Sequence, residues 1–187
     1  GVQVGLGTHV TSVQKIFTQG DYIQTGNDLD LAIEGDGFFQ ILRDGETYYT
    51  RDGSFKRDPD GYIVTANGDR LQPEFAIPDG TTVINVDSSG MLVAEDNAQN
   101  TLGSVQLTVN NFINPAGLKS VGGNLFVETA ASGAANESNP GTNGIGTIAQ
   151  SFLETSNVDV TEEMVNLIIT QRAYEVNSKA ITTADQL

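Results

Sequence analysis

Apolar and polar residues alternate through much of the first 153 residues, which is the pattern of half-buried β-strands. Residues 29–33 alternate in this way, Gly35-Asp-Gly37 interrupts the pattern, and residues 38–42 resume it. Further strands are expected at 47–50, 62–65, 82–86, 91–94, 104–109, 125–129 and 147–153. Strands at this spacing, joined by glycine-rich turns, indicate a β-rich domain with irregular, sandwich- or barrel-like rolled sheets.

Three short sequences predict turns between these strands. Asp44-Gly45 suits the two-residue loop of a hairpin, because both residues tolerate positive φ values. Asp58-Pro-Asp-Gly61 presets φ at its second position through proline and ends on glycine, and Asn67-Gly68 is a further turn signal. The turns therefore divide the domain into short strands.

Residues 130–146 differ from the rest of this domain, because they contain almost no large apolar side chain. Alanine, serine, asparagine and glycine dominate the segment. Such a composition cannot form a core of its own. We expect a long polar loop or an extended arm on the surface, either mobile or held by a neighbour.

The hydrophobic period changes to that of an α-helix after residue 153. Asp159 and Glu162 form an N-cap and N3 pair, a variant of the capping box. Apolar residues then recur every three or four positions, as one stripe: Val165, Ile169, Ala173, Val176, Ala180, Ala184 and Leu187. Five more are expected to widen the stripe: Met164, Leu167, Ile168, Tyr174 and Ile181. The predicted helix is roughly 40 Å long at 1.5 Å per residue.

The fold prediction is therefore a mainly β chain with two parts. Residues 1–153 form a β-rich central domain that carries the polar loop 130–146, and residues 154–187 form one long C-terminal α-helix. An apolar stripe must be buried somewhere to be stable. We expect the helix to be an assembly helix that binds a coiled-coil or bundle partner, with docking onto its own β domain as the alternative.

The charge balance excludes several classes of partner. Asp and Glu number 24 against 9 Lys and Arg, so the net charge is −15. Nucleic acids and anionic membranes select clustered basic residues, so neither is an expected partner. No stretch reaches the ~18 apolar residues of a membrane span, so no membrane insertion is expected.

Residues able to support catalysis are scarce. His9 is the one histidine and cysteine is absent, so Cys–His and Ser–His–Asp schemes are disfavoured, while a Ser–Lys pair stays open. Many acidic residues lie in turns, where aspartate is favoured for its side-chain bonds to the backbone. No metal-ligand spacing is present, and we expect neither an enzyme nor a cofactor. The competing class is a secreted β-rich protein that binds or hydrolyses polysaccharide through paired carboxylates.

Motifs at both ends of the chain resemble the bacterial flagellar rod and hook family. The C-terminal motifs are Leu153-Glu-Thr-Ser-Asn-Val-Asp-Val160, Glu162-Glu-Met-Val-Asn-Leu-Ile168 and Gln171-Arg-Ala-Tyr-Glu-Val-Asn-Ser-Lys179. The others are Gln19-Gly20, Thr25-Gly26, Leu29-Asp-Leu-Ala-Ile33, Gly35-Asp-Gly-Phe-Phe39 and Tyr49-Thr-Arg-Asp-Gly-Ser-Phe55. Within the family, Glu154-Thr-Ser-Asn157 and the segment 134–141 are most similar to the distal rod branch, with hook and proximal rod paralogues as alternatives.

The resemblance implies a structural protein of the flagellar basal body. Family members pass through the type III export apparatus and assemble in the periplasm into a hollow helical tube. That tube contacts neighbouring rod and hook subunits and the surrounding basal-body rings, and its distal part transmits motor torque to the hook. An N-terminal helix of the family pairs with the C-terminal helix in the inner wall. Because this chain begins at Gly1 without that helix, we expect it to be a fragment.

The acidic charge adds an expectation about assembly. Chains of charge −15 repeated along a tube repel one another, so assembly should weaken as ionic strength falls. The alternative is that the few cations, chiefly Arg51, Lys56, Arg57 and Arg70, lie opposite carboxylates of neighbouring chains.

Overall fold

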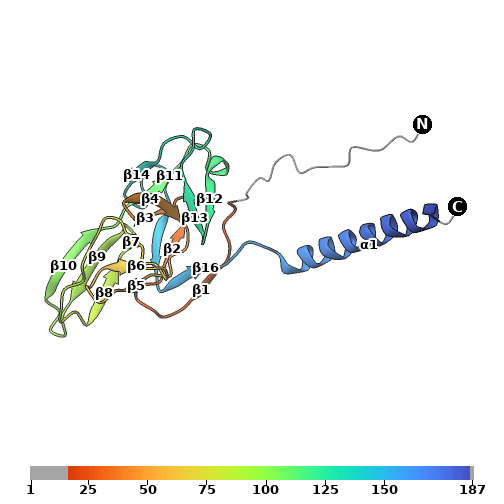
Figure 1. Cartoon of the computed structure of the whole chain (residues 1–187). Helices are drawn as coiled ribbons and strands as arrows, with labels where there is room; N and C mark the ends of the chain where they lie inside the picture. The colour runs from red at the N-terminus through yellow and green to blue at the C-terminus, as the bar shows by residue number, and fades with distance from the viewer. Residues whose placement is uncertain (1–16, 186–187) are drawn as a thin grey trace. The chain divides into compact units, whose positions relative to one another are not determined.

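The computed structural model describes residues 17–185, with the side chains of 184 and 185 left out. His9 and Leu187 lie outside the described residues, as does the side chain of Ala184. The chain divides into two compact units, residues 1–155 and 156–187. Within the described part, the first unit is built mainly from strands and the second holds one long helix (Figure 1).

Short antiparallel strands make up the first unit, here called the β unit. In chain order they are β1 Tyr22–Gln24, β2 Leu31–Glu34, β3 Phe39–Arg43, β4 Glu46–Thr50, β5 Lys56–Arg57, β6 Ile63–Val64, β7 Arg70–Leu71, β8 Val83–Val86, β9 Met91–Glu95, β10 Thr101–Gln106, β11 Val109–Asn111, β12 Lys119–Gly122, β13 Leu125–Val127, β14 Asn136–Ser138, β15 Thr147–Gln150 and β16 Phe152–Glu154. A 3₁₀ turn, η1 Pro115–Gly117, precedes β12, and α1 Val160–Asp185 forms the helix of the second unit.

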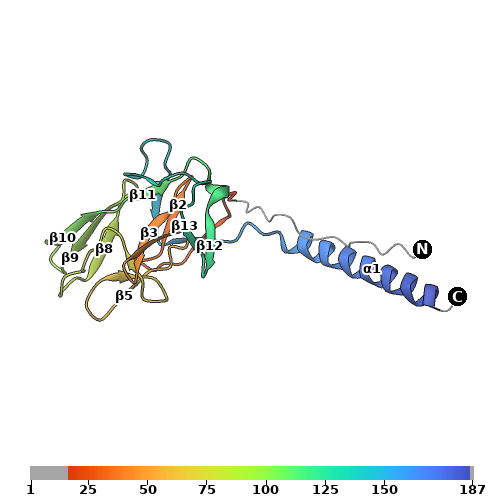
Figure 2. The same cartoon turned by 45° about the horizontal axis from the view of Figure 1, so that its top comes forward.

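The largest sheet has seven strands in the order β12-β13-β4-β3-β7-β6-β5. Its two end strands do not pair with each other, so it is an open, irregular sheet and not a closed barrel. Strands β10, β9 and β8 form a second sheet and lie side by side in both views (Figures 1 and 2). Three two-stranded pairs complete the described unit: β15-β2, β11-β14 and β1-β16. The predicted mainly β fold with one C-terminal helix is confirmed.

The predicted turns are present. Asp44 and Gly45 adopt φ values of 52° and 82°, and Arg43 pairs with Glu46 across the loop, as a two-residue hairpin requires. At the next turn the Gly61 N–H donates to the Asp58 carbonyl at 3.0 Å.

Two predicted strands are each broken into two. The segment 104–109 is divided between β10 and β11, which belong to different sheets. Likewise 147–153 is divided between β15 and β16, because Ser151 adopts a φ of 65° and turns the chain out of the first pairing. Alternation fixes which side chains face inward but does not reveal where a chain changes sheets.

The polar segment 130–146 makes main-chain and side-chain contacts with its own domain. Strand β14 pairs with β11 through main-chain hydrogen bonds, and Ser132 is fully buried, with its hydroxyl donating to the Thr129 and Gly133 carbonyls. Ile145 also joins the main core. Main-chain pairing needs no apolar side chains, which explains why composition did not predict it.

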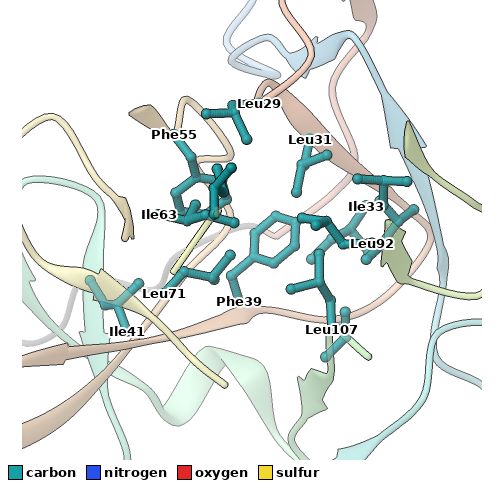
Figure 3. Packing of buried hydrophobic residues seen from close by; sticks show 14 of the residues in the cluster. Leu29, Leu31, Ile33, Phe39, Ile41, Phe55, Ile63, Leu71, Leu92 and Leu107 are labelled. Carbon is teal, nitrogen blue, oxygen red and sulfur yellow. The ribbon is translucent and has the colours of Figure 1, made fainter. Parts of the chain in front are cut away.

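Strand β3 separates two groups of buried side chains because successive residues face opposite sides. Phe39 lies in the middle of the main core, where its ring meets that of Phe55 edge-on at 5.3 Å between centroids (Figure 3). Phe38 enters a second, aromatic group with Tyr49 and Phe112. The register of the chain at Phe38 and Phe39 is therefore fixed by burial on both faces.

Candidate assembly site

Helix α1 begins at the residue that the sequence predicts. The Asp159 carboxylate accepts hydrogen bonds from the backbone N–H groups of Thr161 at 2.8 Å and Glu162 at 3.3 Å. These are two of the N–H groups that have no partner within a helix. The same hydrogen bonds stabilise the charged carboxylate and lower the pKa of Asp159.

Apolar side chains of α1 are exposed to solvent along its described length. The exposed large ones are Val160, Met164, Val165, Leu167, Ile168, Ile169, Tyr174, Val176 and Ile181. Ala173 and Ala180 are exposed as well. Every predicted assembly residue whose side chain is described is thus accessible to a partner. Large apolar side chains rarely stay in water without one.

Helical geometry places most of these residues in two rows, with Met164 and Ile168 on the surface between the rows. At about 100° of rotation per residue, Val165, Ile169 and Val176 lie within one narrow arc, together with the two alanines. Leu167, Tyr174 and Ile181 recur every seven residues, nearly two turns, and form a second row about 140° away. Helix α1 therefore presents apolar surface in two directions, which suits a helix with neighbours on both sides.

Residues 17–185 contain no group of three or more side chains able to hold a metal. A polar depression is lined by Arg43, Asp69, Arg70 and Glu74, among others. There Arg43 Nε donates to Asp69 at 2.7 Å, and that hydrogen bond lowers the pKa of Asp69. A general acid needs a raised pKa, so Asp69 does not fit that role in the hydrolase alternative.

Arginines of the β unit are paired within the chain. Arg43, Arg51, Arg57 and Arg70 each form an ion pair with a carboxylate of the same chain: Asp69, Glu154, Asp79 and Glu74. These cations are therefore already engaged before any neighbouring subunit arrives.

The Arg51 pair is the most extensive of the four. Nε and Nη2 of Arg51 contact Glu154 Oε2 at 2.9 and 2.8 Å. Its Nη1 donates to the carbonyls of Gly35 and Gly37 at 2.9 and 3.0 Å, and Nη2 donates to the carbonyl of Ile33 at 3.1 Å. Five contacts match the five N–H donors of a guanidinium.

Two glycines shape the loop that provides these carbonyls. Gly35 and Gly37 adopt φ values of 115° and 145°, which L side chains rarely adopt. A Cβ on Gly35 would lie 2.9 Å from the Gly146 backbone, and one on Gly37 would lie 2.3 Å from Val109. The interruption that the sequence shows after residue 34 is thus a carbonyl cradle for Arg51.

From the sequence, Arg51 was expected to pair with carboxylates of neighbouring chains, and no role was predicted for Glu154. The two residues are 103 positions apart, so no local pattern joins them. Only one sequence feature pointed to this site: glycine and charged residues are concentrated in the motifs Gly35-Asp-Gly37 and Thr50-Arg-Asp-Gly53. The two motifs meet where Arg51 contacts the Gly35 and Gly37 carbonyls.

Comparison with known proteins identifies the relatives of this chain. The model of the flagellar hook protein FlgE/F/G D1 domain matches residues 32–94, and that of the flagellar basal body rod FlgEFG protein C-terminal region matches residues 149–187. The flagellar basal-body rod protein FlgG of Buchnera aphidicola (from Acyrthosiphon pisum) is 48% identical over 190 residues, which cover 100% of this chain and 73% of the relative.

This chain belongs to the flagellar hook and basal-body rod protein family.

Less similar members of the family also match over the whole chain. FlgG of Agrobacterium fabrum is 46% identical, and FlhP of Bacillus subtilis, a flagellar hook-basal body complex protein, is 35% identical; each match covers 100% of this chain and 72% of the relative. The Arg51–Glu154 contact joins the two matched regions. The D1 match contains Arg51 and the carbonyls that it contacts, and the C-terminal match contains Glu154 and α1.

Among the described residues, α1 lacks the continuous apolar length that a membrane-spanning helix requires.

Proposed function

We propose that this chain is a structural subunit of the distal rod of the flagellar basal body, polymerising with copies of itself into the tube that transmits torque to the hook. The observation that carries the proposal is the pair of exposed apolar rows on α1. Similarity to FlgG rod proteins over the whole chain supports it. Hook and proximal rod paralogues stay as alternatives within the same family.

In this proposal, α1 forms part of the inner wall of the tube and the β unit forms the outer layer. Each apolar row is covered by a helix of a neighbouring copy or by the N-terminal segment of the family. Burying one Val, Leu or Ile is worth roughly 1.5–3 kcal/mol, so several such side chains per row supply a strong driving force for assembly.

The proposed role is mechanical, so it includes no catalysis and no cofactor. Partners are other copies, neighbouring rod and hook subunits and the basal-body rings, in the periplasmic span of the rod. Because the arginines named above are paired internally, acidic side chains remain in excess on each copy. Weaker assembly at low ionic strength is the expected consequence.

The test is tube formation by the full-length protein at high concentration, observed by electron microscopy. Ile169→Gln with Val176→Gln is expected to abolish tubes, because both changes fall in one apolar row. A matched control, Gln171→Ala with Lys179→Gln, changes two exposed polar positions of the same helix and is expected to leave tubes intact. Straight tubes support a rod protein and curved ones the hook alternative, whereas failure of the wild-type protein to form tubes contradicts the proposal.

A further inference from the structure

The chain enters and leaves the β unit at adjacent points. Strand β1 pairs with β16, with Tyr22 opposite Glu154 and Gln24 opposite Phe152. Main-chain hydrogen bonds extend this ribbon at both ends, from the Thr155 N–H to the Asp21 carbonyl at 2.8 Å and from the Thr25 N–H to Ser151 at 2.9 Å. A force transmitted from α1 into the β unit along the backbone therefore first meets the β1–β16 ribbon.

The β1–β16 ribbon has few contacts within itself that could resist such a force. Each of its strands has three residues, and Ile23, at its centre, is exposed. A two-stranded ribbon is marginally stable alone, so its attachment to the remaining sheets determines its stiffness.

Arg51 provides much of that attachment. Its side chain and that of Glu154 are only 17% and 12% exposed, so water competes weakly for their hydrogen bonds. Glu154 is a ribbon residue, and through Oε1 it also accepts the N–H of Gly20 at 2.9 Å. On the other side, Arg51 holds the carbonyl of Ile33 in β2 and those of Gly35 and Gly37 in the turn after β2, all outside the ribbon.

Two side chains near the start of the described chain reach one of these carbonyls. The carbonyl of Ile33 accepts hydrogen bonds from Gln19 Nε2 at 2.9 Å and from the Tyr22 hydroxyl at 3.1 Å. Burial in this region, together with the nearby charge of Glu154, raises the pKa of Tyr22.

We propose that Arg51 is a positioning residue for rod assembly: its guanidinium locks the β1–β16 ribbon to the β unit, so that movement of α1 is transmitted to the outer domain. This inference rests on the proposed function. Lysine cannot replace Arg51, because an ammonium offers three donors from one point whereas this site uses five in a planar fork.

The first experiment is amide hydrogen exchange on the dilute full-length protein. In Arg51→Gln and Arg51→Lys, exchange at Gly20, Thr25 and Thr155 is expected to rise about tenfold or more, since hydrogen bonds to charged groups are lost. Amides of β3 and β4 should keep their wild-type protection. Arg57→Gln is the matched control, because Arg57 and Asp79 form an exposed pair away from the ribbon.

Two results of this experiment would overturn the proposal. Unchanged exchange in the ribbon would show that Arg51 does not hold it. Loss of protection in β3 and β4 as well would show that Arg51 supports the whole β unit and has no specific action on the ribbon.

The second experiment measures tube formation by the same variants. Arg51→Gln and Arg51→Lys are expected to lose most tubes although both apolar rows of α1 are intact, while Arg57→Gln assembles normally. If wild-type protein forms tubes and the Arg51 variants match it, the lock has no role in assembly but the proposed function stands. If the wild-type protein itself forms none, the proposed function fails, and the exchange data still determine whether Arg51 holds the ribbon.

Discussion

The β unit and helix α1 differ in the burial of their apolar side chains. In the β unit, Phe39 and Ile41 are completely buried, whereas Ile169 and Ile181 of α1 are 60% and 69% exposed. The β unit thus obtains its stability from contacts within the chain. Helix α1 has apolar surface in excess of what it buries, so any further stability must come from contacts outside the described part of the chain. One sequence therefore encodes a finished domain and an unfinished assembly element.

The largest expected effect tests the difference between a buried apolar residue of the β unit and an exposed one of α1. Phe39→Ala removes a fully buried ring that meets Phe55 edge-on, and it should lower the free energy of unfolding of the β unit by about 3–5 kcal/mol. Ile169→Ala, at an exposed position, should change it by less than about 0.5 kcal/mol. Urea unfolding of the dilute protein measures both. A comparable loss from Ile169→Ala would mean that α1 is buried within its own chain.

The next largest effect is the dependence of the stability of the β unit on pH. Asp69 accepts a hydrogen bond from Arg43, which lowers the pKa of its carboxyl in the folded state. A folded-state pKa below the unfolded value near 3.9 contributes stability above that pH, and the contribution is lost as pH falls through the folded pKa. Asp69→Asn should therefore lower stability by about 1 kcal/mol at pH 7.

The test follows from the direction of this pH dependence, because ionised Asp69 stabilises the fold and protonated Asp69 does not. Urea midpoints of wild-type protein and Asp69→Asn should converge as the pH falls from 5 to about 2. Asp79→Asn is the control, because its carboxylate is fully exposed and should contribute little at any pH. A constant difference between wild type and Asp69→Asn across this range would assign the loss to hydrogen bonding that does not depend on ionisation.

The smallest expected effect lies at the start of α1. Asp159→Ala removes the acceptor for the Thr161 and Glu162 N–H groups, so the first turn should fray. Because hydrogen bonds lower the pKa of Asp159, wild-type helix content should also fall as pH drops below about 4, and Asp159→Ala should not show that fall.

Circular dichroism and amide exchange in the first turn measure this effect, while the urea midpoint of the β unit should not move. A shift of that midpoint would show that the two units unfold together.

Local chemistry allowed much of the fold to be predicted. The Asp44-Gly45 hairpin, the Asp58–Gly61 turn and the Asp159 cap each depend on residues within a few positions of one another. The apolar positions of α1 also follow from spacing alone, although helical geometry divides most of them into two rows. Local rules operate here because a turn or a cap is determined by φ preferences and nearby hydrogen bonds.

Contacts between distant segments could not be predicted in the same way. The strand β14 in a polar segment, the break at Ser151 and the Arg51–Glu154 pair each depend on which segments lie side by side in space. Arg51 and its carbonyls gain their strength from partial burial, and burial is a property of the assembled sheets. The sequence by itself therefore determined many of the strands, the turns and the apolar positions of α1. Only the tertiary structure decided how the β1–β16 ribbon is held, because the Arg51 guanidinium finds its four acceptor oxygens only after strands far apart in the chain have met.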